Sequence, residues 1–175
     1  KKLRSEVCEF KEDDIVLGNV AKFMPQKNQL LIVEIMRHLP DNYKAIIGGP
    51  FVQEGPLYER DKNYTETIEA KISEYALDDR IQLTFDYVAA DQYMKASDVY
   101  LMPAWDEGFG TPMMEAMACG VPVIANKDEH AFQEWVKDGE NGYLCDIEKP
   151  EDWVEAIQQM AQLSHDQKKS ISQHI

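Results

Sequence analysis

The sequence predicts an α/β domain built on a doubly wound, mostly parallel six-stranded sheet with helices on both faces. Short apolar segments alternate along the chain with longer segments in which apolar residues recur at helical spacing. The apolar segments are nearly continuous, as expected for strands buried on both faces, and Gly or Pro follows several of them. No Gly/Ser-rich linker interrupts this alternation, so we expect one domain.

The first unit is a strand over residues 15–20, followed by a helix that ends before Pro40. Leu31, Ile35 and Leu39 recur at helical spacing and give that helix one apolar stripe. The next expected elements are a strand at 44–47, a helix at 66–75 and a strand at 80–85. The pattern then predicts strands at 99–102, 121–125 and 142–145, and helices at 112–118, 132–137 and 150–163.

The domain boundaries follow from this pattern. We expect residues 15–163 to form the folded domain and residues 164–175 to form a polar C-terminal tail. Residues 1–14 are mixed and charged, and the chain begins with Lys1 rather than Met. We therefore interpret residues 1–14 as a charged lead-in from a preceding domain.

The charge balance argues against a nucleic-acid binder. The chain has 18 Lys and Arg against 32 Asp and Glu, a net charge of −14, so its field repels DNA, RNA and anionic lipid. No apolar run has the length of a membrane span, residues 1–10 lack the apolar centre of a signal peptide, and the 3 cysteines have no paired spacing. We expect a cytoplasmic protein without an integral membrane segment. Peripheral contact of the full-length protein with a membrane stays open.

Ligands of such sheets bind at the carboxyl ends of the strands, and the residues expected in the loops after the strands predict a site there. Gly18 and Lys22, Gly48 and Gly49, and residues 103–110 are each expected between a strand and a helix. These loops can bring backbone N–H groups and cations close to a ligand.

Residues 107–115 read EGFGTPMME and have the composition of an anion-binding loop. Gly108 and Gly110 leave the backbone accessible, and Thr111 before Pro112 has the chemistry of a helix N-cap. Unpaired amides and the positive end of a helix dipole favour a phosphate or a hydroxyl-rich group at this point.

Glu115 is the only ionisable residue of the helix that follows this loop. That helix is apolar almost all round, so we expect it to be buried. A buried carboxylate costs several kcal/mol unless it accepts hydrogen bonds. Either a ligand diol or protein donors must therefore complete Glu115, and the spacing favours neither.

The segment PAWDEGFGTPMMEAMACGVPVIA, residues 103–125, resembles the signature of retaining glycosyltransferases of the GT-B fold, specifically the GT4 family (glycosyl transferases group 1). That family carries two glutamates with the spacing of Glu107 and Glu115 around Gly-Phe-Gly. GNVAKFMPQKN, residues 18–28, is similar to its diphosphate motif, with Lys22 at the position of an Arg and Lys27 at that of a Lys.

The resemblance extends to two further segments. RIQLTFDYV, residues 80–88, is similar to the strand that leads to the base-binding turn, and FQEWVKDGENGYL, residues 132–144, is similar to the family's Glu-x-Val-x-Asp-Gly stretch. The family usually has Gly-Gly before that stretch, whereas this chain has Glu129 and His130. We expect the conformation of this loop to differ.

The resemblance implies the Rossmann-like, donor-binding half of a glycosyltransferase. In the full-length two-domain enzyme this half binds a nucleotide-diphosphate sugar, which is transferred to an acceptor with retention of configuration. Glu107, Lys27 and Lys22 are implied to serve catalysis, and Glu115 to accept from the ribose hydroxyls. The other implied substrate contacts are Gly18, Tyr87, Gly108, Phe109, Gly110 and Thr111.

The same resemblance implies neither a metal nor a cofactor, because two lysines and a helix N-terminus offset the charge of the departing diphosphate. A glycan, lipid or small-molecule acceptor would bind through a missing N-terminal domain, so we expect donor binding without turnover from the chain alone. Two alternatives remain open. One is an epimerase or phosphorylase of the GT-B fold, and the other is a non-catalytic, degenerate nucleotide-binding module.

Overall fold

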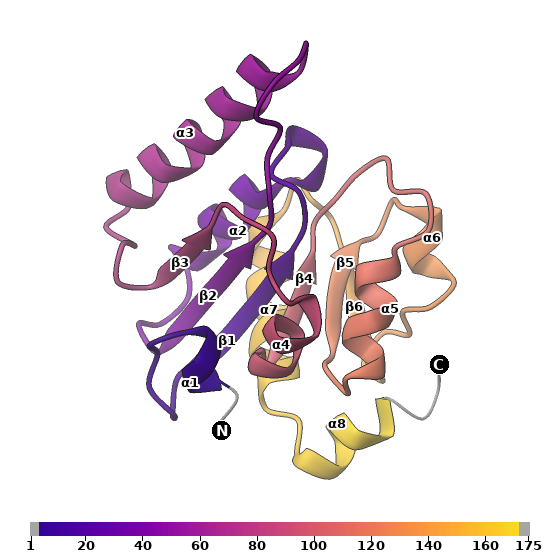
Figure 1. Cartoon of the computed structure of the whole chain (residues 1–175). Helices are drawn as coiled ribbons and strands as arrows, with labels where there is room; N and C mark the ends of the chain where they lie inside the picture. Colours follow the sequence, from indigo (N-terminus) through magenta and orange to yellow (C-terminus); the bar gives the residue numbers. More distant parts are fainter. Residues whose placement is uncertain (1–3, 172–175) are drawn as a thin grey trace.

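The structure is a computed structural model that describes residues 4–171 of the chain (Figure 1). Its centre is a six-stranded, all-parallel sheet in the order β3-β2-β1-β4-β5-β6, which confirms the predicted fold class. The strands are β1 Ile15–Val20, β2 Tyr43–Gly48, β3 Ile81–Thr84, β4 Val99–Met102, β5 Val123–Asn126 and β6 Gly142–Cys145. The chain runs outward from β1 to β3 and then returns to β4 on the other side of β1. The topological switch point therefore lies between β1 and β4.

Helices cover both faces of the sheet, as predicted. They are α1 Arg4–Val7, α2 Gln29–Met36, α3 Tyr58–Glu74, α4 Ala90–Ala96, α5 Thr111–Ala118, α6 His130–Gln133, α7 Pro150–Ala161 and α8 His165–Ile171, with a 3₁₀ turn at Pro25–Lys27. In Figure 1, α4 and α5 lie in front of the sheet, and α2 and α7 lie behind it. The residues of α3 share a core with α2 and α7.

The two faces have separate apolar cores because successive residues of a strand point in opposite directions. In β4, Val99 and Leu101 pack in the core of α2, α3 and α7, whereas Tyr100 and Met102 pack in the core of α4 and α5. Trp153 of α7 is fully buried in the first core, and its indole Nε1 donates to the carbonyl of Asp146 at 2.9 Å.

Several helices differ from the expected ones, and α2 and α7 end a few residues early, at Met36 and Ala161. The third helix begins at Tyr58 rather than at residue 66, since its polar first turns acquire a buried side only by packing against α2, where the Tyr64 hydroxyl accepts from the N–H of Leu30 at 3.3 Å. The helix α4 was not predicted, because it is short and its Tyr93 and Met94 become buried only in the assembled core. The helix α6 ends at Gln133 rather than at residue 137.

The segments outside the predicted boundaries 15–163 are not separate from the domain. Cys8 is buried with Val16, Ile46 and Tyr93, so this part of the predicted lead-in packs on the domain, and its origin in a preceding domain stays a prediction. At the other end, the predicted polar tail contains α8, whose Ile171 is 2% exposed in the core of α5. Residues 1–3 and 172–175 of the two predicted segments lie outside the described residues.

Among the described residues, no helix combines the length and the apolar character that a membrane crossing requires.

Candidate functional site

Three loops meet at the carboxyl ends of the central strands, at the upper edge of the sheet in Figure 1. The β1–α2 loop joins the β4–α5 loop, because the N–H of Trp105 donates to the carbonyl of Gln26 at 3.0 Å. The β5–α6 loop joins it from the other side through the buried Asn126, whose Nδ2 donates to the carbonyl of Ala104 at 3.1 Å. These bonds bring the predicted segments 18–28 and 103–110 together at the switch point.

Lys27 and Glu107 form an ion pair across this junction. Their side chains are 23% and 14% exposed, so the pair is partly withdrawn from water. Lys27 ends the 3₁₀ turn after β1, and Glu107 lies in the loop after β4, 80 positions apart in sequence. The structure therefore places two of the three predicted catalytic residues in direct contact.

Lys22, the third predicted catalytic residue, has a different partner. Its Nζ lies 3.9 Å from Oδ2 of Asp61 in α3. Asp61 is completely buried, its Oδ1 accepts from Arg60 Nε at 2.8 Å, and its Oδ2 accepts no hydrogen bond from any described residue. An isolated buried carboxylate oxygen is costly, so Asp61 holds the Lys22 ammonium nearby. The sequence pattern carried no signal for Asp61, because α3 was expected to begin after it.

The glycine loop presents free backbone donors. Among residues 4–171, the N–H groups of Gly108, Phe109, Gly110 and Thr111 donate no hydrogen bond. Gly110 has φ 75° and is the N-cap of α5, which corrects the prediction that Thr111 caps this helix. Thr111 is instead the first helical residue, because the left-handed turn that starts the helix suits Gly and not Thr. Four unpaired N–H groups at a helix N-terminus can bind an anion.

Glu115 is exposed, contrary to the prediction that it is buried. Only one side of α5 faces the core, through Met113, Ala116 and Met117. The helix composition is apolar all round, but the sheet covers a single stripe, and Thr111 and Glu115 share the open side. Among the described residues the side chain of Glu115 has no hydrogen bond and no ion pair. Its carboxylate is therefore available to a ligand. Because it is exposed to water, it does not need a ligand to complete its hydrogen bonds.

The carboxylates of the site change the pKa of Tyr100 in β4. Burial raises the pKa of the Tyr100 phenol, and the carboxylates of Glu115 and Glu107 raise it further. The phenol oxygen accepts from the N–H of Val20 at 3.0 Å and lies 3.1 Å from the Val20 carbonyl, to which it donates. A protonated Tyr100 thus fixes the end of β1 directly before the loop that carries Lys22.

Two predicted substrate contacts lie away from this cluster. Gly18 is buried in the middle of β1, where a Cβ atom would collide with Oγ of Ser97, so packing explains its missing side chain and we remove it from the site. Tyr87 follows β3, at the far edge of the sheet, and is 86% exposed. Phe109 is 60% exposed in the glycine loop itself.

Glu129 is a residue of this edge whose role the sequence did not reveal. Its two carboxylate oxygens accept from the N–H groups of Asp106 at 2.7 Å and Glu107 at 3.0 Å. The only signal was the acidic residue itself, at a turn where the resembled family usually has glycine.

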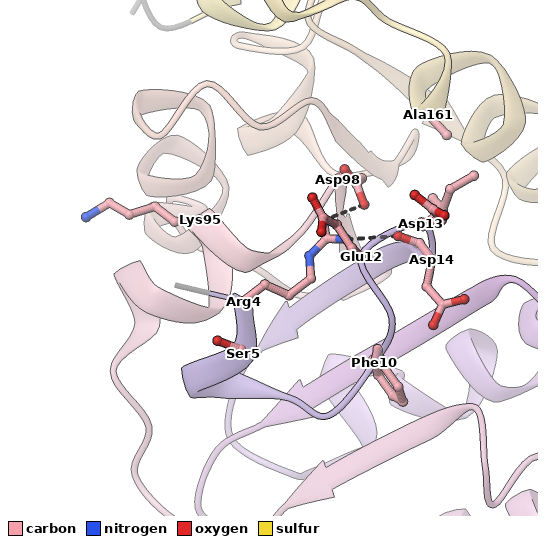
Figure 2. Close-up of a pocket in the computed structure, with 10 residues that line it drawn as sticks. Arg4, Ser5, Phe10, Glu12, Asp13, Asp14, Lys95, Asp98 and Ala161 are labelled. Atoms are coloured by element: carbon pink, nitrogen blue, oxygen red, sulfur yellow. Dashed lines mark hydrogen bonds and ion pairs between the residues drawn. The ribbon is translucent and has the colours of Figure 1, made fainter. Parts of the chain in front are cut away.

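A pocket of about 710 Å³ lies at the opposite, amino-terminal edge of the sheet (Figure 2). There Arg4 donates to Asp98 Oδ2 at 2.8 Å and to the carbonyl of Asp14 at 2.9 Å, so its donors are used within the protein. Lys95 points away from these acids in Figure 2. This pocket brings together none of the predicted site residues.

Among the side chains that the structure describes, no three His, Cys, Asp or Glu residues gather in a group that could hold a metal ion.

Two relatives of this chain are named as glycosyltransferases. The chain is 32% identical over 149 residues to the "Uncharacterized glycosyltransferase MJ1178" of Methanocaldococcus jannaschii, a match over 85% of this chain and 39% of that protein. It is 30% identical over 147 residues to the GDP-mannose-dependent alpha-(1-6)-phosphatidylinositol monomannoside mannosyltransferase of Mycolicibacterium smegmatis, over 77% of this chain and 35% of that protein. The chain thus spans less than half the length of these relatives.

A solved structure shares the fold. The crystal structure of Anabaena Alr3699/HepE in complex with UDP and glucose superposes with a TM-score of 0.81 at 24% sequence identity, over 99% of this chain and 47% of that chain. The family model of glycosyl transferases group 1 matches residues 2–174, nearly the whole sequence. With the parallel sheet and the Glu107 loop at its carboxyl edge, this match shows that the chain belongs to the group 1 glycosyl transferases.

Proposed function

We propose that the domain binds a nucleotide-diphosphate sugar at the carboxyl edge of the sheet. The observation that carries this proposal is the Lys27–Glu107 ion pair, which joins the diphosphate motif after β1 to the glycine loop after β4. A solved neighbour of this fold contains UDP and glucose, and a relative is named as GDP-mannose-dependent. A nucleotide-diphosphate sugar needs a cation for its phosphates and acceptors for its hydroxyls. Lys27 supplies the cation and Glu107 supplies an acceptor.

The proposed roles follow from the chemistry of each group. Lys27 binds the diphosphate, and the free N–H groups of the glycine loop and the N-terminus of α5 add partial positive charge beside it. Glu107 accepts from sugar hydroxyls. Glu115, exposed on the same side of α5 as Thr111, accepts from the ribose hydroxyls. Lys22, whose ammonium lies 3.9 Å from Asp61 Oδ2, is proposed as the second cation for the diphosphate.

The departing diphosphate is stabilised by these preorganised donors. We propose that transfer retains the anomeric configuration and proceeds without a metal, as in the GT4 enzymes that the chain resembles. Acceptor binding and turnover are proposed to need a second domain, because the chain spans 39% of its M. jannaschii relative. A cytoplasmic location is proposed on the same resemblance.

Calorimetric titration of the chain tests the proposal. UDP, GDP and ADP, and the sugar nucleotides UDP-glucose and GDP-mannose, are titrated with and without EDTA. We expect binding of one nucleotide and its sugar derivative, unchanged by EDTA. The absence of heat with every ligand at millimolar concentration would contradict the donor site.

The proposed contact of Glu115 predicts a change in ribose recognition. Wild-type protein should bind the preferred ribonucleoside diphosphate about 10- to 100-fold more tightly than its 2′-deoxy form, because a charge-assisted hydrogen bond contributes roughly 1.5–3 kcal/mol. Glu115→Gln should reduce this ratio toward one. The stability of the variant should stay unchanged, because the side chain is exposed and has no partner among the described residues. Glu140→Gln, an equal loss of charge at another exposed position, is the control, and an undiminished ratio in Glu115→Gln would refute the ribose contact.

A further inference from the structure

We infer that Glu129 is a positioning residue that sets the conformation of the loop carrying Glu107, and through it the affinity for the sugar part of the donor. This inference rests on the proposed donor site. It concerns a residue to which the sequence patterns assigned no role at the site.

The contact between Glu129 and the loop is bidentate. One carboxylate oxygen of Glu129 accepts from the N–H of Asp106 at 2.7 Å, and the other accepts from the N–H of Glu107 at 3.0 Å. A carboxylate that accepts two adjacent backbone donors fixes their relative orientation, and charge-assisted bonds are the stronger kind. Asp106 has φ 60°, in the left-handed region that non-glycine residues rarely adopt. Glu129 therefore stabilises an otherwise unfavourable bend directly before Glu107.

The carboxylate of Glu129 is positioned by the helix α6. Glu129 is the N-cap of α6, and its carbonyl accepts from the N–H of Phe132 at 3.0 Å. Phe132 is fully buried, and its ring lies against Gly110, where an added Cβ would stand only 3.0 Å from a ring carbon. The helix α6 thus holds the glycine loop at two points, at residues 106–107 through Glu129 and at Gly110 through Phe132.

This support acts on the sugar side of the proposed site. The loop residue that Glu129 holds directly, Glu107, is the proposed acceptor for sugar hydroxyls, whereas the free amides proposed for the diphosphate follow it and include that of Gly110, which packs against Phe132. Lys27 is also held by the 3₁₀ turn and the β1–α2 loop, so the diphosphate contact does not depend on Glu129 alone. Loss of Glu129 should therefore affect a sugar nucleotide more than the corresponding diphosphate.

The test uses Glu129→Gln, which keeps the shape of the side chain but leaves only one oxygen to accept. The first measurement is amide hydrogen exchange in the free protein. The N–H groups of Asp106 and Glu107 should exchange on the order of tenfold faster in the variant. The second is titration with UDP and UDP-glucose, and with GDP and GDP-mannose. The affinity for the diphosphate should stay within about twofold, and the affinity for its sugar derivative should fall about tenfold.

Glu134→Gln is the matched control, because Glu134 is an exposed acid just after α6 with no side-chain partner among residues 4–171. It should change neither measurement. Unchanged exchange at residues 106 and 107 in Glu129→Gln overturns the inference, as does an equal change in affinity for both ligands, which would show an effect of charge alone. If the wild-type protein binds none of the four nucleotides, the donor site itself is refuted. The exchange data then still decide separately whether Glu129 holds the loop.

Discussion

Lys27→Met is expected to weaken the binding of a nucleoside diphosphate by about 10- to 100-fold, since a hydrogen bond to a charged group contributes roughly 1.5–3 kcal/mol. The variant removes the cation at the junction of the two loops and leaves Glu107 without its partner, in a protein of net charge −14. An unneutralised carboxylate beside the diphosphate adds repulsion to the lost attraction. Calorimetric titration measures the effect.

Two further variants separate these contributions. Lys95→Met changes the net charge equally but lies on α4, where Lys95 pairs with Asp91, and it should leave the affinity unchanged. In Lys27→Met/Glu107→Gln the repulsion is gone, so its affinity should lie between those of wild type and Lys27→Met. Wild-type affinity in Lys27→Met would remove the central cation from the proposed site.

Gly49→Ala is expected to lower the free energy of unfolding by about 2–4 kcal/mol, from overpacking together with backbone strain. Gly49 follows β2 and has φ 152°, and a Cβ atom built on it collides with the carbonyl of Ala21 and lies 3.3 Å from the backbone nitrogen of Lys22. Those atoms are backbone, held by the bond from the Ala21 N–H to the Gly48 carbonyl at 3.0 Å, so no rotamer change relieves the collision. Denaturant unfolding measures the loss.

Gly108→Ala is the matched control for this effect. No atom lies within 4 Å of a Cβ built at Gly108, so the substitution should leave the free energy of unfolding within about 0.5 kcal/mol of wild type. Since Gly49 packs on the loop that carries Lys22, Gly49→Ala should also weaken nucleotide binding. Equal stability of the two variants would mean that the loop after β1 yields easily, which would argue against its being a rigid diphosphate site.

The sheet was predictable because its strands are local patterns. Residues 15–20, 99–102 and 142–145 form strands with the predicted bounds, and all six predicted strands exist. The helix α7 was equally clear, with Trp153 on its buried stripe. The short helix α4 and the early turns of α3 escaped prediction, because burial in them comes from distant elements rather than from their own periodicity.

The candidate site was predicted in part. The pairing of Lys27 with Glu107 agrees with the motifs that led to both residues. The argument from burial at Glu115 was wrong, because an apolar helix composition does not tell which sides of the helix find a partner. Gly18 was misplaced for a related reason: a glycine in a strand can serve close packing, here against Ser97, as well as a ligand.

The amino-acid sequence by itself determined the parallel α/β architecture, the edge of the sheet where the loops converge and the family to which the chain belongs. These depend on the spacing of neighbouring residues, which a linear pattern preserves. The tertiary structure alone decided that Asp61 lies beneath Lys22, that Glu129 holds the loop before Glu107 and that Glu115 faces outward. Each of these is a contact, or a missing contact, between elements far apart in the chain, and it is decided by which surfaces remain uncovered after the helices have packed.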